Sequence, residues 1–85
     1  MNDAIIKDRE IEILTILMEE CGEVIQECSK ILRFDNDYSN LEKELGDLQA
    51  MVSLLHSDDR VSYTEMDIYE QQKFDKLKRY SNLEI

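Results

Sequence analysis

Apolar residues recur at intervals of three and four along nearly the whole chain, and no proline interrupts them. This spacing gathers apolar side chains on one face of an α-helix, and the chain contains only two of the glycines that would weaken helices. The pattern predicts an all-α fold with helices over about residues 3–33, 39–55 and 62–80. We expect one domain over residues 1–85, a small helical bundle of about three helices.

Polar segments separate the predicted helices. Residues 34–40, FDNDYSN, are rich in Asp and Asn, which satisfy local backbone groups better in turns than within helices. Two Ser-x-x-Glu pairs have the spacing of a capping box, in which the side chains bond to free backbone N–H groups at a helix start. These pairs are Ser39 with Glu42 and Ser62 with Glu65.

The charge of the chain limits its partners. The formal net charge is -10 and the sequence pI is about 4.4, so a nucleic-acid backbone would be repelled. No apolar run approaches the roughly 20 residues that a membrane-spanning helix needs. The first ten residues, MNDAIIKDRE, also lack the layout of a signal peptide. The sequence therefore predicts a cytoplasmic protein with no nucleic-acid or membrane partner.

The two cysteines, Cys21 and Cys28, lie seven residues apart on one predicted helix. Their Cα atoms would be about 10 Å apart, which is too far for an intrachain disulfide. The chain has one histidine, so a Cys–His zinc site is also unfavourable. We interpret both cysteines as small buried residues.

In the first predicted helix, acidic residues continue a stripe that begins as apolar. Ile13 and Ile16 lie beside the main apolar arc, and Glu20 takes the same side a turn later. Glu23 and Glu27 follow on that side. The main arc, which we expect to form the core, comprises Leu14, Leu17, Cys21, Val24, Ile25, Cys28 and Leu32.

In the second predicted helix, two acids fall inside the apolar span. In angular position, Glu44 lies between Leu48 and Met51, and Asp47 lies between Met51 and Leu54. A solvated charged face would place them opposite the leucines. The expected core ridge of this helix comprises Leu41, Leu45, Leu48, Val52 and Leu55.

Acids at positions i and i+3 project from neighbouring turns of one helix face. Two such pairs occur in the chain, Glu20 with Glu23 and Glu44 with Asp47, and antiparallel packing of neighbouring helices can bring the pairs together. Four carboxylates in a partly dry groove need raised pKa values or a bound cation. An all-oxygen ligand set suits Mg²⁺ or Mn²⁺. The alternative is a pair of solvated acidic stripes beside a core.

The only histidine argues against a di-iron site. Bundles of that class use Glu-x-x-His, whereas His56 has Ser53 at i-3 and Val52 at i-4. His56 near a helix C-terminus is better interpreted as a surface residue that interacts with the terminal carbonyl groups.

The acidic pairs resemble a known family signature. The segment Glu19-Glu20-Cys21-Gly22-Glu23, then twenty residues, then Glu44-Leu45-Gly46-Asp47-Leu48, is similar to the EE-x-x-E…E-x-x-D signature. This signature is that of the MazG-like all-α nucleoside triphosphate pyrophosphohydrolases. The quoted motifs cover only about residues 18–55.

The resemblance implies Mg²⁺-dependent hydrolysis of (deoxy)nucleoside triphosphates between the α and β phosphates, giving the monophosphate and pyrophosphate. Such a reaction would serve nucleotide pool control or house-cleaning, and Mn²⁺ could replace Mg²⁺. The residues matching the metal ligands are Glu20, Glu23, Glu44 and Asp47. Glu19 matches an additional motif acid expected to orient the attacking water or help deprotonate it.

The resemblance also implies a homodimer or a dimer of dimers, with substrate sites near the subunit interface. A small chain buries a limited core, so completing the bundle by homo-oligomerisation is also physically reasonable. Gly22 and Gly46 each precede a motif acid, and we hypothesise close approach there by another helix or by the substrate.

Other functions stay open on sequence alone. A non-catalytic metal- or nucleotide-binding regulatory module could keep the same acidic groove, and a purely structural acidic bundle would show no cation dependence. Basic residues late in the third helix either balance the helix C-terminus or contact phosphates; they are Lys73, Lys76, Lys78 and Arg79. We interpret the aromatic residues as part of the core rather than as contacts to a nucleotide base.

Overall fold

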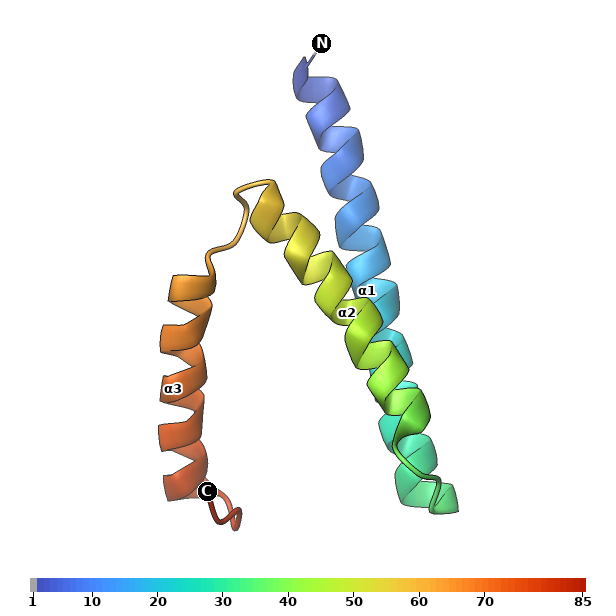
Figure 1. Cartoon of the computed structure of the whole chain (residues 1–85), viewed down its shortest axis with the longest axis vertical. Coiled ribbons are helices and arrows are strands. Elements are labelled where there is room, and N and C mark those ends of the chain that lie inside the picture. The colour runs from blue at the N-terminus through green and yellow to red at the C-terminus, as the bar shows by residue number, and fades with distance from the viewer. Residues whose placement is uncertain (1) are drawn as a thin grey trace. The chain divides into compact units, whose positions relative to one another are not determined.

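Three helices account for most of the chain (Figure 1). The computed structural model describes the backbone of residues 2–85 and the side chains of residues 8–85. Its helices are α1 (Asn2–Phe34), α2 (Ser39–Ser57) and α3 (Tyr63–Tyr80). No strand occurs in residues 2–85, which confirms the predicted all-α fold. The predicted helix boundaries agree with these bounds to within two residues.

The turn between α1 and α2 uses its Asp residues. The N–H of Asp35 donates to the carbonyl of Ile31 at 3.0 Å, and Asp35 has a φ of 55°. Asp is among the few residues that tolerate this left-handed region. Asp37 Oδ1 accepts hydrogen bonds from the Ser39 N–H at 3.1 Å and the Ser39 hydroxyl at 2.7 Å.

These contacts correct the first predicted capping box. The Ser39 hydroxyl is turned back to Asp37, and the N–H of Glu42 donates to the carbonyl of Tyr38 at 2.9 Å. Asp37 accepts the hydrogen bond from the Ser39 N–H that the Glu42 carboxylate would accept in a capping box, and the Tyr38 carbonyl accepts from the Glu42 N–H. The predicted start of α2 at Ser39 is nevertheless confirmed.

The start of α3 matches its prediction. The Ser62 hydroxyl accepts a hydrogen bond from the N–H of Glu65 at 3.3 Å, so Ser62 caps the helix. In the preceding loop Asp59 has a φ of 59°, and its N–H donates to the carbonyl of His56 at 3.0 Å. The exposed His56 ring stacks on Tyr63, with ring centroids 4.0 Å apart.

Contacts divide the chain into two units, residues 1–55 and 56–85. In the first unit, α2 runs back along α1 in the opposite direction (Figure 1). Its core is small, because only three of the described apolar side chains are buried. They are Ile13 at 5%, and Met51 and Leu55 at 8% each.

The face that α1 turns towards α2 differs from the prediction. Ile13 is buried and Val24 is partly buried, and Glu20 and Glu27 lie on the same covered side. One helix cannot cover so broad an apolar surface, and α2 covers the side that carries Ile13. Much of the predicted main arc is exposed instead: Leu14, Cys21, Ile25, Cys28 and Leu32.

Two further core predictions are corrected. Both cysteines are free thiols, as expected, but they are exposed because they lie on the uncovered side of α1. On α2, Leu45 is exposed, whereas Met51, which lies outside the predicted ridge, is buried.

The second unit contains α3, which has no buried residue. The aromatic residues expected in the core are all exposed: Phe34, Tyr38, Tyr63, Tyr69, Phe74 and Tyr80. Neither of the two units buries enough surface to enclose them. No helix in the described part of the chain has the length and apolar character needed to cross a membrane.

Candidate metal centre

Three carboxylates from two helices come together. Oxygen atoms of Glu20 on α1 and of Glu44 and Asp47 on α2 all lie within 4.8 Å of one another. Glu44 and Asp47 share a face because they are three positions apart along α2. The antiparallel course of the helices brings Glu20 opposite that pair. All three side chains are partly buried, so this cluster is not a fully solvated acidic stripe.

The electrostatics of the cluster are unfavourable without a counter-ion. Burial raises the pKa of Glu20, and the negative charges of Asp47, Glu44 and Glu23 raise it further. In addition, Glu20 Oε2 is buried and has no hydrogen-bond partner. An unpartnered buried carboxylate oxygen normally costs stability. Glu20 Oε2 is therefore an acceptor whose missing partner a proton or a cation would supply.

Lys43 brings a positive charge to two of these carboxylates. Its Nζ atom lies 3.3 Å from Glu44 Oε1 and 3.1 Å from Asp47 Oδ2. These ion pairs raise the pKa of Lys43. The sequence pattern did not lead us to this residue, although its position one residue before Glu44 and four before Asp47 was a usable signal.

The other predicted site residues lie outside the three-carboxylate group. Glu23 is exposed on the next turn of α1, yet its charge acts on Glu20. Glu19 is exposed on α1 beside Glu20. Because Glu19 and Glu23 are four positions apart, their side chains project from adjacent turns.

Glu27 is neither part of this group nor solvated. It is 8% exposed, and its Oε2 atom accepts a hydrogen bond from Lys30 Nζ at 3.2 Å. This ion pair gives both residues a structural role on α1.

The glycines beside the motif acids are not required by packing within the described chain. A Cβ atom added to Gly22 or Gly46 would meet no atom within 4 Å. Close approach by a partner or a substrate therefore stays a hypothesis for both positions.

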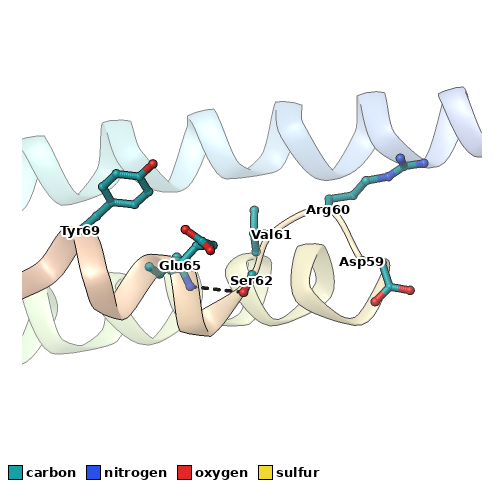
Figure 2. A pocket seen from close by; sticks show the side chains of 7 residues that line it. Asp59, Arg60, Val61, Ser62, Glu65 and Tyr69 are labelled. Carbon is teal, nitrogen blue, oxygen red and sulfur yellow. Dashed lines mark hydrogen bonds between the residues drawn. The ribbon is translucent and has the colours of Figure 1, made fainter.

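Cavities also occur elsewhere in the described part of the chain. One, of about 230 Å³, lies at the α1–α2 turn and is lined by Cys28, Ile31, Leu32, Tyr38 and Leu41. Another, of about 550 Å³, lies at the start of α3 in the second unit. Figure 2 shows Tyr69 and Glu65 from α3 and Val61 from the loop around it, with the hydrogen bond between Ser62 and Glu65.

The donor chemistry of the cluster fits a hard divalent cation. Carboxylate oxygens are the ligands that Mg²⁺ and Mn²⁺ prefer, and no sulfur or imidazole takes part in this group of three described residues. The orphaned Glu20 oxygen is the kind of atom that a cation would coordinate. The basic residues late in α3 lie in the other unit.

Comparison with known proteins agrees with the motif. The family model of the MazG nucleotide pyrophosphohydrolase domain matches residues 9–81, well beyond the segment that contains the two acidic motifs. No curated protein and no solved structure matches the chain.

Proposed function

This chain belongs to the MazG nucleotide pyrophosphohydrolase family, and from that premise we propose that it hydrolyses (deoxy)nucleoside triphosphates to the monophosphate and pyrophosphate. The observation that carries the proposal is the meeting of Glu20, Glu44 and Asp47 from two separate motifs. The physiological role of the reaction would be nucleotide pool control or house-cleaning.

We propose Mg²⁺ as the cofactor, held by Glu20, Glu44 and Asp47, with Glu23 completing the ligand set. When bound, the cation supplies positive charge that neutralises phosphate oxygens and makes a water molecule more acidic. The chain supplies the negative ligand cage, and α1 and α2 hold its parts in register. Mn²⁺ is expected to replace Mg²⁺ because it has the same preference for oxygen ligands.

Glu19 is proposed as the residue that orients the attacking water and accepts its proton. The side chain is exposed and so can reach a water outside the three-carboxylate group. As an ionised carboxylate it can accept the proton, and it lies one residue from the ligand Glu20. Glu19 thus acts on the nucleophile, whereas Glu20 holds the cofactor.

The oligomer is proposed to form through an uncharged strip on α1. We use the name α1 strip for its seven exposed residues: Ile11, Leu14, Met18, Cys21, Ile25, Cys28 and Leu32. They are spaced by alternating intervals of three and four, the pattern of a two-helix seam. The adjoining positions Thr15, Gly22 and Ser29 are also uncharged.

A second copy of the chain is the proposed occupant of the α1 strip. Because each copy carries a net charge of -10, two copies repel one another least when the surfaces in contact are uncharged. The core of residues 1–55 is small, so burying this strip would add substantially to stability. A partner helix would also explain Gly22, whose Cα has open space beside it in the single chain.

Product analysis by ³¹P NMR tests the reaction directly. The protein is incubated with Mg²⁺ and each of a panel of standard and modified nucleoside triphosphates. The proposal predicts resonances of pyrophosphate and the nucleoside monophosphate. Nucleoside diphosphate with inorganic phosphate would instead indicate cleavage between the β and γ phosphates. A folded, Mg²⁺-binding protein that releases neither product would instead support a non-catalytic binding module.

A further inference from the structure

Lys43 makes contacts that helix stability does not explain. It lies at the fifth residue of α2, far from the helix C-terminus, where the macrodipole would favour a positive charge. In its pair with Asp47 the lysine precedes the acid by four residues, which is the less favourable order on a helix. The side chain is also 67% exposed, so it has little packing role.

Its contacts coincide with the cation ligands. The Nζ atom lies 3.3 Å from Glu44 and 3.1 Å from Asp47, two of the three acids that meet at the candidate centre. The ammonium therefore binds to two of the carboxylates that a cation would use. A divalent cation on these carboxylates would also lie close to the ammonium and repel it strongly.

We propose that Lys43 is a built-in counter-ion, which partly neutralises Glu44 and Asp47 in the metal-free protein and which the divalent cation displaces. This inference rests on the proposed function, because it takes Glu44 and Asp47 as cation ligands. The two positive charges compete, so each weakens the binding of the other by the same factor. Lys43 thereby sets the cation concentration at which the centre fills.

Metal binding alone tests this role. Mn²⁺ is titrated into the full chain and free Mn²⁺ is measured by electron paramagnetic resonance, for wild type, Lys43→Met and Lys43→Arg. The matched control is Lys76→Met, which makes the same change in net charge on α3. Circular dichroism verifies that all four proteins are helical.

The competition predicts that Lys43→Met lowers the Mn²⁺ Kd about threefold to tenfold, a range expected for losing two exposed ion pairs. Lys43→Arg and Lys76→Met should both stay within about twofold of wild type. An unchanged or higher Kd for Lys43→Met would overturn the inference while leaving the metal centre in place.

Failure of the proposed function would give a different result from failure of the Lys43 inference alone. If wild type shows no Mn²⁺ binding, or if Glu44→Gln leaves the Kd unchanged, the metal centre itself is wrong and the role of Lys43 is wrong with it.

A second measurement follows the Lys43 side chain by NMR. The ¹³Cε resonance of Lys43, assigned by its loss in Lys43→Met, should shift on addition of Mg²⁺. No shift at saturating Mg²⁺ would contradict displacement.

Discussion

Glu20 on α1 and Glu44 on α2 bring carboxylate oxygens within 4.8 Å of one another, although they belong to separate sequence motifs. Two like charges at that distance oppose the packing of α1 on α2 unless something compensates them. Asp47 adds a third carboxylate to the same site. We interpret this unfavourable arrangement as the property that selects a divalent cation.

Removing one of these charges should stabilise the metal-free chain. We predict that Glu20→Gln raises the Tm in the presence of EDTA, because the amide avoids both the repulsion and the burial of a charge. The same variant should lose the increase in Tm that Mg²⁺ gives to wild type. Differential scanning calorimetry with and without Mg²⁺ measures both effects. A lower Tm in EDTA would show that the Glu20 carboxylate is stabilised by contacts other than a cation.

Glu19 should affect turnover without affecting metal binding. Replacing a general base typically lowers the rate by about 10² to 10⁴-fold, and we predict a loss of kcat in this range for Glu19→Gln. Its Mn²⁺ Kd should match that of wild type, since Glu19 lies outside the three-carboxylate group. Equal losses of kcat and metal affinity would instead make Glu19 a ligand.

The α1 strip can be tested by placing a charge in it. Ile25 is 69% exposed, so Ile25→Glu should leave the helix intact but convert the proposed homodimer into monomers. The control is Gln26→Glu, which makes the same charge change at an exposed neighbour outside the strip. Light scattering after size-exclusion chromatography gives the molar mass of wild type and of both variants. A monomeric wild type at micromolar concentration would rule out this interface.

The Asp37 turn should be sensitive to acid. Hydrogen bonds from Ser39 hold the pKa of Asp37 below its ordinary value of 3.8, because they favour the ionised form. The stability that they provide is therefore present above about pH 3.8 and is lost as the pH falls through the lower folded-state pKa. We predict that Asp37→Ala lowers the Tm by a few degrees at pH 7. The difference from wild type should shrink below pH 3.8; a difference independent of pH would exclude ionisation as its source.

The sequence was sufficient to predict the helices and the shared face of Glu44 and Asp47 on α2. Both depend on local spacing: apolar residues at three and four positions define a helix, and Glu44 and Asp47 at i and i+3 share a face whatever surrounds them. The cap at Ser62 was predicted for the same reason. At Ser39, the competing acceptor Asp37 lies two residues earlier and was a signal that could have been used.

The rotation of α1 about its axis could not be derived in this way. The apolar surface of α1 is broader than one partner helix, so the pattern leaves open which part faces α2. The side with Ile13 and Glu20 is covered, whereas Cys21 and Ile25 are exposed. The contacts of Lys43 depend on the conformation of a flexible side chain, which a pattern of residue types does not define.

The most direct test of the metal centre compares two neighbouring acids of α2. Pyrophosphate release from a panel of nucleoside triphosphates is measured with Mg²⁺ for wild type, Glu44→Gln and Glu42→Gln; Glu42 is exposed and lies outside the three-carboxylate group. We predict that Glu44→Gln abolishes release and that Glu42→Gln retains most of it. Release by Glu44→Gln at the wild-type rate would contradict the claim that the meeting of Glu20, Glu44 and Asp47 is the catalytic metal centre.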